Sequence, residues 1–111
     1  MNIKANYNLV KMITHILEHL KTLVIHRSIK DDFIPEEILK PLEEADELMK
    51  NGIYEKAYGK YLNAIGNGFS ENYLTTEYCK RLDVSIEICN DELNKLENKL
   101  EKENSLELNL K

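Results

Sequence analysis

The chain has 111 residues, of which 42% are hydrophobic and 32% are charged, and this balance excludes a disordered chain and favours one globular domain. Its formal net charge of −5 argues against sequence-independent nucleic-acid binding, which needs a surface rich in Lys and Arg. With only two prolines and four glycines, the chain is expected to form long regular elements.

The first element is expected to be a helix from about Asn6 to about His26. Apolar residues recur at steps of three and four from Val10 to Val24, and further apolar residues widen the stripe to about 160°. A face this broad is typical of a helix that packs against two or more neighbours in a bundle. Lys, His and Glu residues interrupt the apolar run, so it predicts neither a secretory signal nor a membrane span. We therefore expect a cytoplasmic protein.

The second helix is expected to begin near a proline and to end at a glycine. Pro35 suits a first helical turn, but Pro41 inside a helix would remove a hydrogen bond and cost about 3 kcal/mol. We therefore expect a short turn over residues 35–39, or a kink, and a regular helix from about Pro41 to Lys50. Gly52 would supply the left-handed residue that ends this helix.

The third helix is expected from about Ile53 to Ile65. The glycine-rich sequence 66–68 then predicts its end. Gly59 would cost about 1 kcal/mol relative to Ala inside the helix, so we interpret it as a point of close contact between helices.

The region 38–66 resembles a single tetratricopeptide-type helical hairpin. The residues that match this pattern are Ala45, Leu48, Gly52, Tyr54, Ala57, Tyr61 and Ala64. The resemblance implies protein or peptide contact. Two positions depart from the family pattern, because Pro41 stands where the family has an aromatic residue and no proline closes the second helix. No second copy follows at a period near 34 residues, so a solenoid is not predicted. The spacing is also similar to other small hairpins, including nucleotidyltransferase-associated helical domains, whose Arg/His ribonuclease motif is absent here.

The fourth helix is expected to be capped by Ser70 and to reach about Glu103. From Leu82 its apolar residues follow a short heptad seam, which could pack on the domain and meet a second copy of the chain further along. Residues 105–111 alternate Leu with polar residues and are interpreted as a C-terminal tail, either frayed or extended in a groove. The predicted organisation is one helical domain over residues 1–104, followed by this tail.

The two cysteines, Cys79 and Cys89, are ten positions apart on the predicted fourth helix. At 1.5 Å of rise per residue they would lie about 15 Å apart, beyond the reach of a disulfide. Two unpaired thiols in a reducing compartment are therefore expected.

One motif raises the possibility of metal chemistry. His15, Glu18 and His19 form the sequence H-x-x-E-H, which places both imidazoles on one helical face and is the written form of an inverted zinc-protease motif. A solvated polar stripe explains the same residues, and a divalent-metal site at His15 and His19 remains an alternative.

Acid–base chemistry has no clearer candidate. The acidic run 43–47 predicts a solvated helix face, and no Ser or Cys lies in a nucleophile motif. We therefore expect a protein that is not an enzyme and needs no cofactor.

Together these patterns predict an all-α antiparallel bundle of about four helices that acts as a small interaction protein: an adaptor, a regulator or an immunity-type partner. A nucleic-acid-associated regulator remains a further alternative. The candidate contact residues lie on the third and fourth helices: Tyr54, Tyr58, Tyr61, Leu93, Leu96 and Leu100. Tyr suits an interface because it offers apolar area and a hydrogen-bonding group together, although these Tyr rings could equally complete the core. The expected partner is a protein or peptide, with a possible homodimer through the fourth helix.

Overall fold

The computed structural model describes residues 2–26, 34, 36–70 and 76–109, with side chains described over 2–22, 34, 36–67 and 77–104. Four helices make up these described regions: α1 (Ile3–His26), α2 (Glu36–Lys50), α3 (Tyr54–Ser70) and α4 (Thr76–Asn109). The predicted all-α bundle is confirmed.

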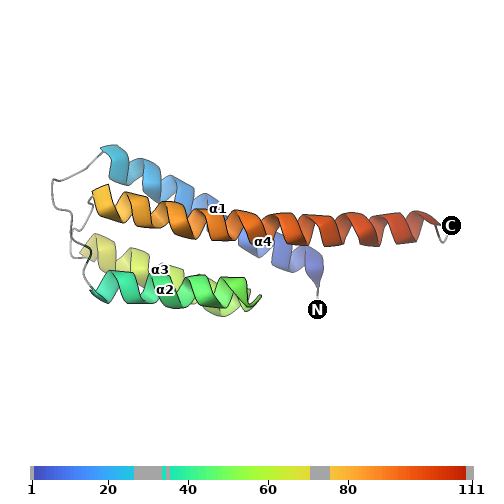
Figure 1. Ribbon diagram of the computed structural model, residues 1–111, viewed down its shortest axis with the longest axis horizontal. Coiled ribbons are helices and arrows are strands. Elements are labelled where there is room, and N and C mark those ends of the chain that lie inside the picture. Colours follow the sequence, from blue (N-terminus) through green and yellow to red (C-terminus); the bar gives the residue numbers. More distant parts are fainter. Residues whose placement is uncertain (1, 27–33, 35, 71–75, 110–111) are drawn as a thin grey trace.

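The helices form two antiparallel pairs that pack side by side (Figure 1). The first pair joins α1 to α4, the two ends of the chain, and the second pair is the α2–α3 hairpin. An ion pair between Lys21 and Asp83 links α1 to α4. The far end of α4 projects beyond the other helices, which gives the molecule its long axis of 59 Å against 23 and 16 Å across (Figure 1).

Helix α1 begins earlier than its sequence predicts, at Ile3 instead of about Asn6. Asn2 explains the difference because its side-chain Oδ1 accepts a hydrogen bond from the backbone N–H of Ala5 at 3.1 Å. This is the N-cap interaction that Asn favours, and it satisfies one of the N–H groups that a helix start leaves open.

Helix α2 runs without a break from Glu36 through Pro41, so the predicted turn is wrong over residues 36–39, and residue 35 lies outside the described residues. A proline leaves the carbonyl four residues before it without its helical donor, here the carbonyl of Glu37. Asn67 on α3 supplies the missing donor, because its side-chain Nδ2 donates to that oxygen at 2.9 Å. The neighbouring helix therefore offsets part of the cost of the proline.

The turn between α2 and α3 follows the predicted glycine cap. Gly52 has a φ of 77°, in the left-handed region that glycine adopts without strain. Its N–H donates to the carbonyl of Met49 at 3.1 Å, and the N–H of Ile53 donates to that of Leu48 at 2.9 Å. These two bonds form a Schellman motif, which satisfies the last carbonyls of α2 and reverses the chain within a few residues.

Three other predicted boundaries are wrong. Helix α3 passes through Gly66 and ends at Ser70, so Ser70 closes α3 and does not cap α4, which begins at Thr76. Helix propensity is a weak constraint, and the bond from Asn67 to α2 holds the glycine-containing end of α3 in place. Helix α4 continues to Asn109, beyond the predicted end near Glu103, since Leu and Glu are good helix formers.

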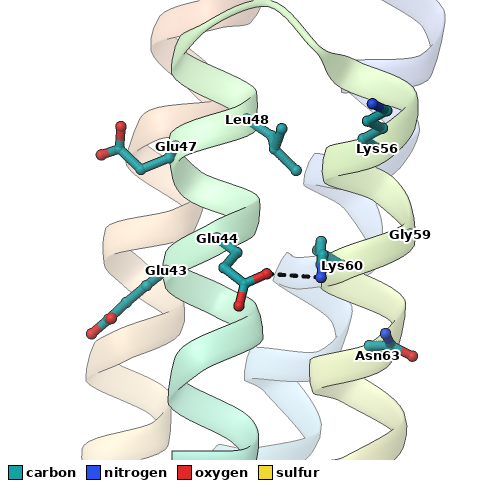
Figure 2. Close-up of a pocket in the computed structure, with 8 residues that line it drawn as sticks. All are labelled: Glu43, Glu44, Glu47, Leu48, Lys56, Gly59, Lys60 and Asn63. Carbon is teal, nitrogen blue, oxygen red and sulfur yellow. Dashed lines mark ion pairs between the residues drawn. The ribbon is translucent and has the colours of Figure 1, made fainter.

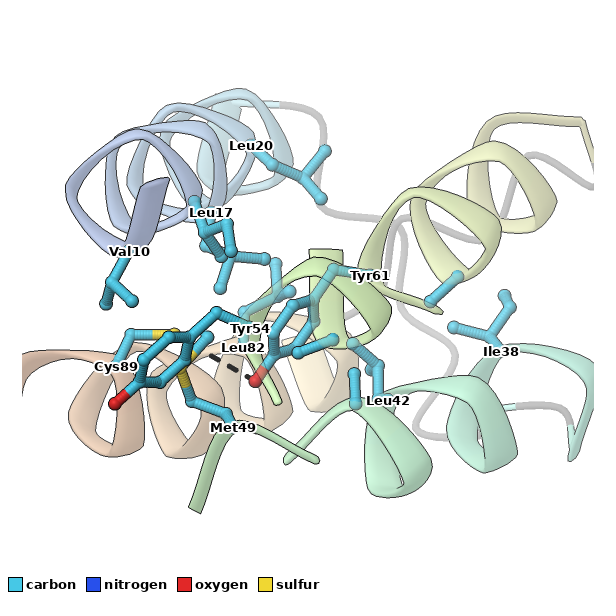
Figure 3. Close-up of a cluster of buried hydrophobic side chains, with 14 of the residues drawn as sticks. Val10, Leu17, Leu20, Ile38, Leu42, Met49, Tyr54, Tyr61, Leu82 and Cys89 are labelled. Carbon is cyan, nitrogen blue, oxygen red and sulfur yellow. Dashed lines mark hydrogen bonds between the residues drawn. The ribbon is translucent and has the colours of Figure 1, made fainter. Parts of the chain in front are cut away.

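The core lies between the two pairs and receives side chains from all four helices (Figure 3). Full burial of a Leu, Ile, Val or Met side chain contributes about 1.5–3 kcal/mol. The buried residues of this core are Val10, Ile13, Leu17, Leu20, Ile38, Leu42, Ala45, Met49, Tyr54, Ala57, Tyr61, Ala64, Tyr78, Leu82, Cys89 and Leu96.

The heptad seam of α4 is largely used inside this chain. Leu82 and Cys89 are fully buried, and Leu96 is 3% exposed. Beyond Leu100 the described side chains, residues 101–104, are polar and exposed, so the seam does not continue over these four residues. Elsewhere on the described part of α4, Val84 is 48% exposed and Leu93 and Leu100 are partly exposed, and the predicted homodimer through this helix stays a prediction.

Candidate interaction surface

A groove of about 770 Å³ runs along the outer face of the α2–α3 hairpin (Figure 2). Helix α2 forms one wall and α3 the other, and Figure 2 shows Leu48 pointing into the space between them. The lining residues are Glu43, Glu44, Glu47 and Leu48 from α2, with Lys56, Gly59, Lys60 and Asn63 from α3. A second hollow of about 420 Å³, also between α2 and α3, shares Glu44 with this groove.

The two walls carry opposite charges. The α2 wall is acidic and the α3 wall is basic, and one ion pair closes the gap, with Nζ of Lys60 2.7 Å from Oε2 of Glu44. This hydrogen bond from Lys60 lowers the pKa of the Glu44 carboxyl below its ordinary value. Both side chains are about 40% exposed, at 42% and 40%, so an exposed pair of this kind contributes little to stability and remains available to a partner.

Acidic residues on α2 and basic residues on α3 lie at similar levels along the helix axes, so they face each other across the groove. Because α2 and α3 are antiparallel about Gly52, residues at similar separations from that turn lie opposite each other. Glu44 and Lys60 are both eight positions from Gly52, and Glu47 and Lys56 are five and four positions away. Figure 2 shows the same order, with Glu47 and Lys56 nearer the turn and Glu44 and Lys60 further from it.

Gly59 leaves an opening in the α3 wall. A Cβ atom built at Gly59 would meet no atom of the described chain within 4 Å, so the predicted close contact between helices at this position is wrong. Gly66 is equally open and lies seven positions further on, about 20° away around the helix. The outer face of α3 is therefore accessible to close approach from outside the molecule.

The inner face of the same hairpin carries a buried polar network that the sequence patterns did not predict. Asp46 on α2 is 4% exposed. Its Oδ1 accepts a hydrogen bond from the Tyr61 hydroxyl at 2.6 Å, and its Oδ2 accepts one from Nη2 of Arg81 at 2.5 Å. Nη1 of Arg81 also donates to the Ser85 hydroxyl at 3.1 Å. One carboxylate thus joins α2 to α3 and α4.

A second carboxylate makes a similar connection nearer the turn. Glu92 on α4 is 5% exposed and accepts a hydrogen bond from the Tyr54 hydroxyl at 3.0 Å. Its other oxygen accepts one from Nζ of Lys95 at 2.9 Å. The hairpin is therefore attached to α4 by a tyrosine–carboxylate pair as well as by the pair of Asp46 and Arg81.

Burial keeps the nearby tyrosine hydroxyls and the Cys89 thiol protonated. Desolvation raises the pKa of the Tyr61 hydroxyl and raises that of Tyr54 to about 12. Burial also raises the pKa of the Cys89 thiol to about 12, and its Sγ lies 3.9 Å from the Tyr61 oxygen (Figure 3). At neutral pH these groups act as hydrogen-bond donors within the core, and the Cys89 thiol is not ionised for nucleophilic attack.

Asp46 lies in the acidic run 43–47, whose composition predicts a solvated face. For Asp46 that prediction is wrong, because its side chain is buried. A signal was present, since Asp46 is four positions after Leu42 and three before Met49, two fully buried residues of the inner stripe. A charged residue in phase with an apolar stripe indicates a buried ion pair.

The predicted contact residues separate into two groups. Tyr54, Tyr61 and Leu96 are 8%, 1% and 3% exposed and belong to the core, so the structure does not leave them available as a contact surface. The remaining three, Tyr58, Leu93 and Leu100, are partly exposed. Two of the buried tyrosines use their hydroxyls on carboxylates, which explains how the core accommodates them.

Tyr58 borders a narrow apolar crevice between α1 and α3, together with Ile16, Leu62 and Ile65. Leu62 is 42% exposed, and Met12 on α1 is 41% exposed. Apolar residues of this size are common singly on protein surfaces. Its described lining residues carry no charge, so the geometry of the crevice does not indicate the chemistry of a partner.

His15 and His19 are exposed on the outer side of α1. Within the described side chains, no three His, Cys, Asp or Glu residues come together in a way that could hold a metal ion. Cys79 and Cys89 are both unpaired, as predicted.

No helix in the described part of the chain has the length and apolar character needed to cross a bilayer. Comparisons with protein families, with characterised proteins and with solved structures found no match to this chain.

Proposed function

We propose that this chain is a non-enzymatic protein–protein interaction module whose docking surface is the groove on the outer face of the α2–α3 hairpin. The observation that carries the proposal is the pairing of an acidic wall with a basic wall around an open position at Gly59. Charged walls of opposite sign select a partner and its orientation, since a wrong partner would meet like charges.

The glycine supports the same interpretation. Gly inside a helix costs about 1 kcal/mol relative to Ala, and no described atom of this chain occupies the space that a side chain at Gly59 would fill. Docking of a partner backbone against α3 would use that space. The resemblance to a tetratricopeptide-type hairpin also implies protein or peptide contact at this part of the chain.

The groove also gives the proposed partner a chemical description. A helix or extended peptide that presents basic residues toward α2 and acidic residues toward α3 would complement both walls. The methylene stems of Lys56 and Lys60 and the side chain of Leu48 would supply the apolar contact between the charges. We further propose that the protein acts in the cytoplasm, where two free cysteines remain reduced.

Site-specific photo-crosslinking in the native cell tests this proposal. Gly59 lines the groove, and a Cβ atom built there meets no described atom within 4 Å, so the fold should accept a photoreactive side chain at this position. We expect a discrete protein adduct from this position. A matched chain with the same group at the exposed Asn8 on α1 should not give that adduct. Identical adducts at both positions, or none at Gly59, would contradict the proposed surface.

A further inference from the structure

The charge pattern of the groove is complementary to itself. We infer that the groove binds a second copy of this chain, with a two-fold axis parallel to α2 and α3. The inference rests on the proposed function, because it identifies the occupant of the same groove. It differs from the homodimer predicted at the sequence level, which used α4.

Symmetry decides which arrangement the charges permit. A two-fold axis parallel to the helices places α2 of one copy over α3 of the other and preserves the height of every residue along the axis. Glu47 then faces Lys56 of the second copy, and Glu44 faces Lys60 of the second copy. Each contact occurs twice, because an isologous interface repeats every contact.

The alternative two-fold axis, across the helices, is unfavourable. It would place α2 over α2 and α3 over α3 with the heights reversed, so that the acidic wall of one copy faces the acidic wall of the other and the basic wall faces the basic wall. Like charges in direct contact across an interface oppose association. The parallel axis is therefore the arrangement that the charges favour.

The open α3 wall is suited to this contact. Gly59 lets the partner's α2 approach the backbone of α3. Leu48 is four positions from Gly52, so it would lie at the level of the partner's Lys56, which is also four positions from that turn. The Glu44–Lys60 pair of the single chain would be extended into a ring of four charges across the interface. Such a network is stronger than an isolated exposed pair.

The size of the face predicts a weak dimer. Two helices of this length cover a face about 22 Å long and about 20 Å wide. That area is at the low end for specific complexes, so we expect a reversible dimer with micromolar affinity. Its affinity should fall as salt concentration rises, because its charges lie near the surface.

Three charge variants test the inference. The acidic-wall variant carries Lys56→Glu and Lys60→Glu, so that both walls are acidic. The basic-wall variant carries Glu44→Lys and Glu47→Lys, so that both walls are basic. The swapped variant combines all four substitutions and retains the net charge of −5. Glu and Lys have similar helix propensities, so the fold should tolerate each change, and circular dichroism checks this directly.

Sedimentation velocity over about 1 μM to about 1 mM measures association. We expect the wild-type chain to dimerise, and each single-wall variant to dimerise at least about 100-fold more weakly. An equimolar mixture of the two single-wall variants should form a heterodimer. The swapped variant should dimerise with itself and not with the wild-type chain.

A control keeps the total charge change equal but moves it away from the groove. Lys99→Glu with Lys102→Glu alters two exposed lysines on the projecting end of α4, and this variant should dimerise like the wild type. Loss of dimerisation in this control would assign the interface to α4 and overturn the inference.

The remaining outcomes are equally decisive. A wild-type chain that stays monomeric to about 1 mM would overturn the inference of a dimer. The proposed function would not fall with it, because a crosslink from Gly59 to a different protein would still support the groove as a docking surface. A wild-type dimer that both single-wall variants preserve would overturn the inference, as would a mixture of those variants that stays monomeric.

Discussion

The two faces of the α2–α3 hairpin use similar residues for different purposes. Asp46 and Glu47 are neighbours in sequence, but Asp46 is 4% exposed and holds α3 and α4, whereas Glu47 lines the outer groove. A step of one residue turns a helix by about 100°, which is enough to move a carboxylate from the core to the surface. Helical phase thus separates residues that stabilise the fold from residues that can contact a partner.

This difference has an energetic consequence. Removing one member of a buried, hydrogen-bonded charge pair leaves the other member without compensation, whereas exposed pairs contribute about 0–1 kcal/mol. Substitutions on the inner face should therefore change stability and those on the outer face should change binding.

The largest expected effect is the protection of the Cys89 thiol on the inner face. Its pKa is raised by burial from an ordinary value of 9.0 to about 12, so below pH 9 its thiolate fraction is reduced about 10³-fold. In a Cys79→Ser chain at pH 8, a thiol-reactive dye should label Cys89 at least about 10³-fold more slowly in the native protein than in urea. Similar labelling rates in the native protein and in urea would show that the packing of the hairpin against α4 does not keep Cys89 buried.

Asp46→Ala should destabilise the chain more than any single substitution on the outer face of the hairpin. It removes the acceptor of both Tyr61 and Arg81, and the loss of a buried partner of this kind costs about 3 kcal/mol or more. Urea unfolding followed by circular dichroism measures the effect. The matched Glu47→Ala on the outer face should change the free energy of unfolding by less than about 0.5 kcal/mol. Equal effects would remove the distinction between the faces.

Tyr61→Phe should have a smaller effect because it keeps the ring and deletes only the hydroxyl. The lost hydrogen bond to a carboxylate, 2.6 Å long, is expected to cost about 1.5–3 kcal/mol of unfolding free energy. Tyr58→Phe serves as the control on a partly exposed ring of the same helix and should change stability by less than about 0.5 kcal/mol. Chemical denaturation of both variants gives the comparison.

Gly59→Ala should produce the smallest change, and it should stabilise the chain. The added methyl group meets no described atom within 4 Å, and Ala favours the helix over Gly by about 0.5–1 kcal/mol. A modest rise in the melting temperature would show that the chain holds this glycine at a cost to its stability.

Gly52→Ala should destabilise the chain, because a φ of 77° is strained for Ala.

Sequence periodicity was sufficient for the helices and for most of the core. Apolar spacing identified the inner stripes of α1 and α4, and the glycine rule identified the turn at Gly52, because both signals are local. The boundaries that failed depend on contacts between distant residues. Pro41 is tolerated inside α2 because of Asn67 on α3, and no local pattern contains that bond.

The candidate groove was only partly accessible to sequence reasoning. Apart from Asp46, the acidic run on α2 is recognisable from the sequence as a surface. That Glu44 and Lys60 lie at the same level along the groove follows only from the antiparallel pairing of α2 and α3 and from the tight turn between them. Residue type alone predicts Tyr54, Tyr58 and Tyr61 as contact residues, but Tyr54 and Tyr61 are core residues. Residue type does not distinguish a buried tyrosine that donates to a carboxylate from one exposed at an interface.

The pairing of α1 with α4 sets an order for folding during synthesis. Helix α1 leaves the ribosome before the other three helices, yet the helix that covers its apolar face is the last of the four to be made. The central hairpin, by contrast, is joined by a turn of a few residues and makes contacts that are local in sequence, which form fastest. The nascent chain should therefore complete its middle before its two ends can meet, with α1 exposed to chaperones until then.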